Sequence, residues 1–362
     1  MRIGRDKKLH RALKRLFESE RENEDISSLF NDFLGIPQEE VSMEGERLGE
    51  SLPYEDFLLS FFDGAFPPYV KRKLSEGILE IDPEERLIHN PYWKALRGMN
   101  CSEGGLSLVS KEVLPFCLFP YSGISTGPAP YYEEKNGFAY SRQPFSYPEF
   151  KQNGRPWMSL VPHELVTMEG AIARASGKVL TYGLGMGYFA FMASLKDDVT
   201  SVTVLEKDRR ILSFFRENLL PRFPKKEKIV LIEDDAIEFA SRQGKGSYDF
   251  LFADIYHDAE DGLPLYLKLR QMEGAAKENS YWIEGDLLVY LRRYFVAFLE
   301  EQSDPEIQSK GEEAYPKGES FQDALFRAIY LNCQEKELNS VEDLGEFLSA
   351  DSLKRTAKSL KI

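Results

Sequence analysis

The sequence predicts an α/β protein built on a doubly wound, mostly parallel sheet. Three observations between residues 177 and 285 lead to this prediction. Short apolar runs alternate with helical segments, a glycine-rich turn joins the first run to a helix, and acidic residues follow the next three runs. Alternation of this kind requires right-handed crossovers between parallel strands, which place helices on both faces of one sheet.

The individual elements follow from apolar runs and helical spacing. The predicted strands are Val179–Tyr182, Ser201–Leu205, Ile229–Ile232, Phe250–Ala253 and Tyr281–Ile283. The predicted helices between them cover about 187–195, 208–220, 235–242 and 263–272. A helix from Pro162 to about Ala175 precedes the first strand, because proline suits the first helical position. A long apolar helix, 286–301, closes the unit.

The chain on either side of this unit changes character. Residues 1–100 predict a helical N-terminal domain, which begins with an amphipathic helix over residues 1–17. Residues 101–161 predict a β-hairpin-rich segment, because Asn136-Gly137 and Asn153-Gly154 are strong hairpin-turn signals. Residues 303–320 predict a charged linker or lid, and a helical tail follows, with Ser340 and Asp343 spaced as a capping box. The expected domains are therefore 1–100, 101–161, 162–302 and 303–362.

Composition excludes several classes of protein. The 362 residues include 60 acidic and 46 basic side chains, a net charge of −14, which argues against a nucleic-acid binder. Three widely spaced cysteines and four histidines indicate neither a disulfide framework nor a metal site. The polar start lacks a secretory signal, and the apolar run Leu287–Leu299 is too short to cross a bilayer. We therefore expect a cytoplasmic protein with no membrane partner; the oligomeric state is left open.

The most informative segment is the run from Val179 to Phe189, in which a strand leads through Gly183, Gly185 and Gly187 into a helix. Glycine is needed where the backbone turns sharply or a ligand approaches it closely. The helix that follows offers free N–H groups to an anionic group. Glycine-rich turns without a ligand are also common, so the neighbouring residues decide the interpretation.

Acidic residues end the next three strands, at the edge of the sheet where α/β folds bind ligands. Glu206 follows the second strand and can accept both hydroxyls of a ribose; the alternative is a surface acid at a strand end. Asp234 and Asp235 follow the third strand, where Asp235 can accept the adenine amino group, cap a helix, or do both. Asp254 ends the fourth strand.

Two nucleotide-binding patterns compete for this segment. Dinucleotide-binding proteins prefer G-x-G-x-x-G, whose third glycine falls at Tyr188 here. The G-x-G-x-G that is present, with acids after strands two to four, resembles class I S-adenosylmethionine-dependent methyltransferases over roughly residues 160–300. The resemblance implies a Rossmann-like fold and S-adenosyl-L-methionine as the cofactor, although no further strand pair follows helix 286–301 to complete a seven-stranded sheet.

The resemblance also implies roles for particular positions. The methionine part of the cofactor would lie on the loop, the ribose on Glu206, and the adenine on Asp235 and Ala236. Aromatic faces attract cations, so Tyr182 and Tyr188 can face the sulfonium, or else belong to the core. The implied cofactor-binding residues are Gly183, Leu184, Gly185, Met186, Gly187, Glu206, Asp235, Ala236, Tyr182 and His163.

Within that superfamily the sequence is similar to the spermidine-synthase-like branch. His163-Glu164 precedes the glycine loop by about the distance of the His-Glu pair in that family, although His163 can equally be a structural histidine at a helix end. Asp254 matches the acid that deprotonates the attacking amine. Two departures weigh against aminopropyl transfer. Met186 stands where that family has an acid, and Tyr256-His257-Asp258 replaces its Asp-Pro pair.

The predicted activity is therefore methyl transfer from S-adenosylmethionine to an acceptor. The sequence lacks the Asn/Asp-Pro-Pro-Tyr motif and the Pro-Cys nucleophile of nucleic-acid methylases, which favours a small molecule or a protein as acceptor, with a small molecule preferred. The candidate catalytic residues are Asp254, Tyr256 and His257. The alternatives are a spermidine-synthase-like aminopropyltransferase, an NAD-dependent oxidoreductase and a non-catalytic protein that binds S-adenosylmethionine.

Overall fold

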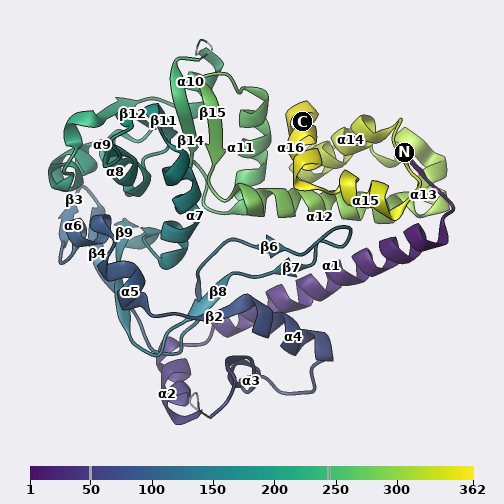
Figure 1. The fold of residues 1–362 in the computed structure, drawn as a ribbon, viewed down its shortest axis with the longest axis horizontal. Helices are drawn as coiled ribbons and strands as arrows, with labels where there is room; N and C mark the ends of the chain where they lie inside the picture. The colour runs from purple at the N-terminus through teal and green to yellow at the C-terminus, as the bar shows by residue number, and fades with distance from the viewer. Residues whose placement is uncertain (49–50, 243, 245) are drawn as a thin grey trace.

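A five-stranded parallel sheet forms the centre of the computed structural model, which describes residues 1–48, 51–242, 244 and 246–362. Its strand order is β13-β12-β11-β14-β15, so the direction of winding reverses between β11 and β14 (Figure 1). This topology confirms the predicted doubly wound, Rossmann-like α/β fold. The strands are β11 (Gly177–Tyr182), β12 (Val199–Glu206), β13 (Ile229–Glu233), β14 (Tyr248–Ala253) and β15 (Ala276–Tyr281).

The predicted helices of this unit are present, with shifted ends. Their bounds are α7 (Pro162–Arg174), α8 (Tyr188–Ser194), α9 (Arg209–Phe214), α10 (Ala236–Arg242), α11 (Ala259–Gln271) and α12 (Glu284–Gln302). The segment predicted as one helix over 208–220 is α9 continued by a π-helical turn, Phe215–Leu219.

The fifth strand lies earlier than predicted. The prediction of Tyr281–Ile283 was wrong, because β15 ends at Tyr281 and Ile283 adopts φ +44° as the N-cap of α12. The strand begins with exposed Lys277 and Glu278 at the edge of the sheet, so its first half has no apolar run. Among the described residues no sixth or seventh strand joins this sheet.

An antiparallel sheet precedes the α/β unit and confirms the β-rich prediction for residues 101–160. Its order is β10-β9-β4-β3, with β3 (Cys101–Glu103), β4 (Leu106–Val113), β9 (Phe145–Gln152) and β10 (Arg155–Ser159). Asn153 and Gly154 form the turn between β9 and β10 with φ values of +51° and +79°. Positive φ at both positions is what a tight hairpin turn requires, so this hairpin was predicted correctly.

The second predicted hairpin is wrong. Asn136-Gly137 joins β7 (Glu134–Lys135) to β8 (Phe138–Tyr140), but β7 pairs with β6 (Ser125–Thr126), and β8 lies between β2 (Ile78–Glu80) and β5 (Phe119–Pro120). The glycine serves close packing instead. A Cβ on Gly137 would lie 2.2 Å from the carbonyl oxygen of Ser122.

The N-terminal region is helical, as predicted. Its first helix continues far beyond residue 17, where the sequence predicted its end. Helix α1 has 28 residues and buries Leu9, Leu13 and Leu16 in the same core as the central sheet. Its middle packs along α12 (Figure 1). The helices are α1 (Lys7–Leu34), α2 (Gln38–Leu48), α3 (Tyr54–Leu59), α4 (Pro68–Gly77), α5 (Pro83–Ile88) and α6 (Pro91–Leu96).

The C-terminal region returns to the start of the chain. Residues 303–320, predicted as a linker or lid, contain α13 (Pro305–Lys310) and a 3₁₀ turn, Gly311–Ala314, because Asp304 caps the new helix. The tail consists of α14 (Phe321–Cys333), β16 (Glu337–Leu338), α15 (Val341–Phe347) and α16 (Ala350–Ser359). The capping box of Ser340 and Asp343 is confirmed, and β16 pairs with β1 (Arg2–Ile3). No helix in the described part of the chain is both long and apolar enough to span a membrane.

Candidate functional site

The glycine loop occupies the carboxyl end of β11, at the point where the strand order reverses. Gly183, Gly185 and Gly187 all have positive φ, at +89°, +53° and +78°. Side chains rarely adopt this conformation, so the loop requires glycine at each position. Gly187 is also the N-cap of α8, which places the N-terminus of that helix at the loop.

Two of these glycines are also explained by packing within the protein. A Cβ on Gly183 would lie 1.8 Å from the carbonyl oxygen of Asp254, and a Cβ on Gly187 would lie 2.4 Å from the ring of Phe215. Gly185 is different, because the nearest atom to its Cβ would be Met158 Cε at 3.0 Å, the end of a flexible side chain. Gly185 is therefore the loop glycine whose backbone is covered only by a flexible side chain, that of Met158.

The loop is held in place by a segment distant in the sequence. Tyr92, in α6, is fully buried and donates a hydrogen bond to the carbonyl oxygen of Met186. Asn90, the N-cap of the same helix, donates from Nδ2 to the hydroxyl of Tyr188 over 3.0 Å. Burial raises the pKa of Tyr92, so the hydroxyl remains a donor. The helical N-terminal region thus fixes the shape of the loop.

Glu206 ends β12 beside the loop and is only 9% exposed, so it is not a surface acid. Its Oε1 accepts a hydrogen bond from the backbone N–H of Asp208 at 2.8 Å, and its Oε2 accepts one from Leu184 at 3.4 Å. Burial raises its pKa. Each carboxylate oxygen can accept more than one hydrogen bond, so both still have capacity for a ligand hydroxyl.

The acids after β13 have helix-capping and ion-pairing roles. Asp235 Oδ1 accepts hydrogen bonds from the N–H groups of Ile237 and Glu238, at 2.8 and 3.0 Å, and so caps α10. Asp234 pairs with Arg242 at 2.6 Å. Asp235 therefore caps a helix, which is one of the two roles that the sequence predicts for it. The capping bonds use Oδ1 only, and among the described residues no protein group donates a hydrogen bond to Oδ2. Asp235 also lines a cavity.

Two adjacent cavities, which share part of their lining, lie along this edge of the sheet. The outer chamber, about 380 Å³, is bounded by the ends of β12 and β13 and by β10. It is lined by Gln152, Trp157, Met158, Gly183, Gly185, Leu205, Glu206, Lys207, Asp208, Ile211, Asp234, Asp235, Ala236, Ile237, Asp254, Ile255, Tyr256, His257 and Leu265. Its size and mixed lining are those of a small-molecule site.

The inner chamber, about 280 Å³, lies between α7, α8 and the end of β14. It shares Gly185, Met158 and Asp254 with the outer chamber, so the two meet at these residues. Its lining is Pro156, Trp157, Met158, Ser159, Leu160, Val161, Glu164, Met168, Thr181, Gly183, Leu184, Gly185, Met186, Tyr188, Phe189, Ala190, Phe252, Asp254, Tyr256, His257 and Trp282.

Asp254 stands at the junction, and its carboxyl group titrates near neutrality. Burial raises its pKa to about 7, while His257 opposes this shift. Glu164, in α7, faces the same chamber, and burial together with the charge of Asp254 raises its pKa well above the usual value. Groups with such shifted pKa values in a cavity mark candidate acids and bases.

The other candidate catalytic residues are less suited to proton transfer. Tyr256 is buried and donates its hydroxyl to the carbonyl oxygen of Trp282 at 2.6 Å, and burial raises its pKa further. His257 is exposed, and its Nδ1 lies 3.1 Å from Asp261. Asp258 caps α11 and does not line either chamber. Asp254 is therefore the candidate base that the geometry favours.

His163 and Tyr182 lie outside both chambers. Burial lowers the pKa of His163 to about 4, and its ring packs edge-on against Trp282. Tyr182 is 2% exposed and packs against Phe239. His163 thus lies where a structural histidine would, and Tyr182 lies in the core. A role of either residue in cofactor binding stays a prediction.

Sequence reasoning missed three lining residues from elements that precede the glycine loop. Trp157 and Met158, in β10, line both chambers. Glu164, the neighbour of His163, lines the inner chamber together with Asp254. The pattern of acids at the strand ends does not predict these contacts. The hairpin turn at Asn153-Gly154 predicts a strand at β10 but not which of its side chains point toward the glycine loop.

A larger cavity, about 700 Å³, lies between α5, α6 and the β4–β9 pair, away from the glycine loop. Its lining includes Trp93, Phe145 and Arg97 but no residue of the candidate site. Among the described residues no group of three or more His, Cys, Asp or Glu side chains could hold a metal ion.

Comparison with known proteins finds structural likeness only. No family model matches the chain, and no curated protein matches its sequence. A probable spermidine synthase from Corynebacterium glutamicum is 18% identical over 37% of this chain and 55% of its own, with a TM-score of 0.29. Spermidine synthase from Thermotoga maritima is 14% identical over 38% and 52%, with a TM-score of 0.28. The CcbJ methyltransferase from Streptomyces caelestis is 18% identical over 31% and 48%, with a TM-score of 0.23.

The chain thus spans about half the length of the solved structures it matches. At these identities and TM-scores the likeness does not indicate an activity for this chain. The two chambers are the features from which a function can be inferred.

Proposed function

We propose that the protein is an S-adenosylmethionine-dependent methyltransferase that acts on a small-molecule acceptor. The observation that carries the proposal is the pair of adjacent chambers at the carboxyl edge of the sheet. The outer chamber, with Glu206 and Gly185, suits a nucleoside, and Asp254 lines both chambers. A donor and an acceptor must meet in this way for a group to pass directly between them.

The residues of the outer chamber fit the proposed cofactor. Glu206 offers two carboxylate oxygens with remaining acceptor capacity to the ribose hydroxyls. Oδ2 of Asp235 can accept a hydrogen bond from the adenine amino group, and Ala236 and Ile237 lie beside it in the cavity lining. The methionine part would lie along the glycine loop, where α8 begins and its N-terminus favours a carboxylate.

When bound, the cofactor supplies a methyl group on a positively charged sulfur, which is already activated for displacement. The protein must then orient the acceptor, exclude water and remove a proton where the acceptor carries one. Asp254, with a pKa of about 7, is partly ionised at neutral pH and lies at the junction of the chambers. Trp157 and Met158 form part of the lining of both chambers.

The alternatives fit the site less well. For an NAD enzyme the third glycine would be Tyr188, which instead is 5% exposed and hydrogen-bonded to Asn90. For aminopropyl transfer the loop would have an acid at Met186, whose side chain is 6% exposed in the lining of the inner chamber. A helix N-terminus at the loop also favours a cofactor that keeps its carboxylate, by up to about 1 kcal/mol.

Calorimetric titration with S-adenosylmethionine and S-adenosylhomocysteine tests the proposal. Glu206→Gln keeps an oxygen acceptor and should raise the Kd about tenfold, because a charge-assisted hydrogen bond is roughly twice as strong as a neutral one. Glu206→Ala should raise it more, about 30-fold, but also removes the acceptor of two backbone N–H groups and therefore needs a parallel stability measurement.

Glu233→Gln is the matched control, because Glu233 lies opposite Glu206 at the end of the next strand and lines neither chamber. Its Kd should stay at the wild-type value. No binding heat at millimolar cofactor would refute the proposal. Tighter binding of decarboxylated S-adenosylmethionine than of the intact cofactor would instead support aminopropyl transfer.

A further inference from the structure

Strand β10 contributes two consecutive side chains to the candidate site. Trp157 and Met158 both line the outer and the inner chamber. Neighbouring residues of a regular strand point to opposite faces of its sheet, so two consecutive side chains do not normally enter the same cavity. Their common direction therefore needs a local departure from regular strand geometry.

A β-bulge supplies this departure. In the pairing of β10 with β9, Pro156 lies opposite Lys151 and Met158 lies opposite Phe150, which leaves Trp157 without a partner residue. The extra residue puts Met158 on the face of the sheet from which Phe150 packs into the core. The ring of Trp157 lies 5.5 Å from that of Phe150. Bulges are common beside active sites, where they redirect a side chain.

The side chain of Met158 lies directly over the glycine loop. A Cβ on Gly185 would lie 3.0 Å from Cε and 3.4 Å from Sδ of Met158. Both residues line both chambers, so their contact lies where the chambers adjoin. The thioether therefore occupies the space above Gly185, along which the methionine part of the proposed cofactor would pass.

Three features allow this side chain to move away from Gly185. A methionine side chain is unbranched and flexible, so it can repack in more than one way. Strand β10 is an edge strand that pairs with β9 alone, and the bulge interrupts that pairing. Pro156 has no backbone N–H with which to strengthen it. Met158 is also only partly buried, so its displacement leaves the core closed.

We propose that Met158 gates the donor site: it covers Gly185 until the amino acid part of S-adenosylmethionine displaces it, and this displacement opens the passage between the two chambers. The inference rests on the proposed function, because it takes S-adenosylmethionine as the donor. Met158 is thus a positioning residue, and the order of binding follows from it. The donor binds first, since the passage to the acceptor is closed before the donor arrives.

Calorimetric titration with S-adenosylhomocysteine and with adenosine tests the gate. Only S-adenosylhomocysteine has an amino acid part that must displace Met158. Met158→Ala should therefore raise the affinity for S-adenosylhomocysteine by about threefold or more and change that for adenosine by less than about twofold. A side chain that merely contacts the bound ligand predicts the opposite sign. Weaker binding of S-adenosylhomocysteine to the alanine variant, or equal changes for both ligands, would overturn the inference.

Met158→Phe is a second variant with the opposite expected effect. Phenylalanine is bulkier and has fewer rotatable bonds, so S-adenosylhomocysteine should bind about tenfold more weakly while adenosine changes little. Met192→Ala is the matched control. Met192, in α8, is also a partly buried methionine packed against the core, but it lines neither chamber. Both ligands should bind to this control as they bind to the wild type.

Methyl NMR of protein labelled with ¹³C-methyl methionine observes the gate directly. The chain has 8 methionines, and the signal of Met158 is the one missing from the spectrum of Met158→Ala. This signal should shift when S-adenosylhomocysteine binds and stay in place when adenosine binds. An unchanged Met158 signal in the complex with S-adenosylhomocysteine would show that the side chain is not displaced.

The failures of the two proposals are distinguishable. If neither S-adenosylhomocysteine nor adenosine binds, the methyltransferase proposal falls and the gate falls with it. If S-adenosylhomocysteine binds with an affinity that does not depend on residue 158, the gate is wrong and the proposed function stands.

Discussion

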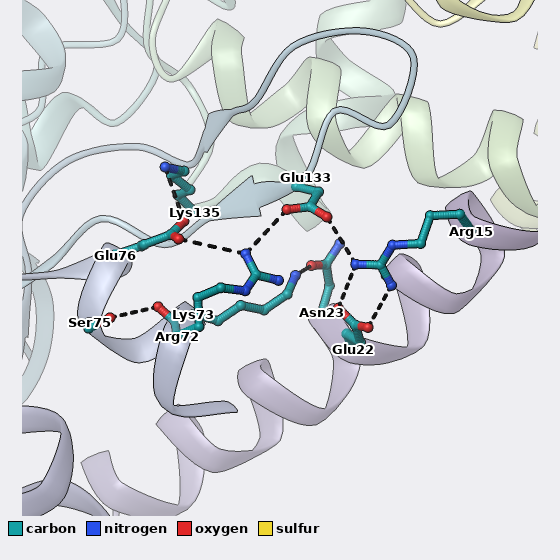
Figure 2. A network of polar contacts seen from close by, with 9 residues as sticks. All are labelled: Arg15, Glu22, Asn23, Arg72, Lys73, Ser75, Glu76, Glu133 and Lys135. Carbon is teal, nitrogen blue, oxygen red and sulfur yellow. Dashed lines mark hydrogen bonds and ion pairs between the residues drawn. The ribbon is translucent and has the colours of Figure 1, made fainter. Parts of the chain in front are cut away.

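Two charged regions of the molecule use their carboxylates in opposite ways. In the network between α1, α4 and β7, each acidic side chain contacts a base: Arg15 lies 2.7 Å from Glu22 and 2.9 Å from Glu133, and Arg72 also reaches Glu133 (Figure 2). In the inner chamber, Glu164 and Asp254 line one cavity, and no lysine or arginine is among its lining residues.

The difference separates carboxylates that hold elements together through ion pairs from carboxylates that line a cavity without a lysine or arginine partner. A paired carboxylate contributes its interaction energy to the folded chain. An unpaired carboxylate that is partly removed from water costs stability. This contrast gives three expectations about stability.

The largest effect is expected where a partnered charge is also buried. Glu134 has a side chain only 6% exposed and receives two hydrogen bonds from the guanidinium of Arg293, one of them 2.9 Å long. Arg293→Met should lower the free energy of unfolding by about 3 kcal/mol, because it leaves Glu134 buried without its partner. Urea denaturation measures this. Arg209→Met, at a side chain 87% exposed, should change it by less than about 0.5 kcal/mol.

An intermediate effect of opposite sign is expected in the inner chamber. The pKa of Asp254 is raised to about 7 in the folded state, so the folded chain binds a proton more tightly than the unfolded chain. The resulting stability is complete below about pH 4 and is lost as the pH rises through 7. Asp254→Asn should flatten this decline and raise stability at pH 8 by roughly 1–2 kcal/mol.

Thermal unfolding of both proteins between pH 4 and 8 checks this expectation. A variant that is less stable than the wild type at pH 8 would show that Asp254 is already satisfied within the protein. The contrast between the two regions would then disappear.

The smallest effect is expected at the exposed end of the partnered network. Arg72 is 42% exposed and lies 3.3 Å from Glu133 and 3.6 Å from Glu76. Arg72→Ala should lower the free energy of unfolding by about 0.5 kcal/mol or less, and 1 M salt should remove most of that difference. A loss above about 2 kcal/mol would mean that the network in Figure 2 acts as a buried cluster.

The fold and the outer chamber were largely predictable from the sequence. Strand–helix alternation and the loop at Gly183–Gly187 fixed the parallel sheet, and Glu206 was placed at the correct edge because parallel strands end on the same side. The start of β15 was missed because Lys277 and Glu278, which point to opposite faces of this edge strand, are both exposed. There, apolar periodicity carries no signal.

The inner chamber was not predictable, because segments far apart in the sequence build it. Glu164 comes from α7, Trp157 from β10 and Asp254 from the end of β14, and only the packed structure brings them together. The burial of Glu206 was missed for a related reason. A strand-end acid is exposed unless a neighbouring loop, here at Leu184, covers it.

The short pairing of β1 with β16 determines when this chain can complete its fold. Helix α1 buries Leu9, Leu13 and Leu16 against a core that includes residues of α12 and α15, and β1 finds its partner only at Glu337 and Leu338. During synthesis the first half of the apolar stripe of α1 therefore lacks these partners until nearly the whole chain has left the ribosome. Contacts so distant in sequence slow folding and prolong exposure to aggregation, so the first helix to be made is among the last to be secured.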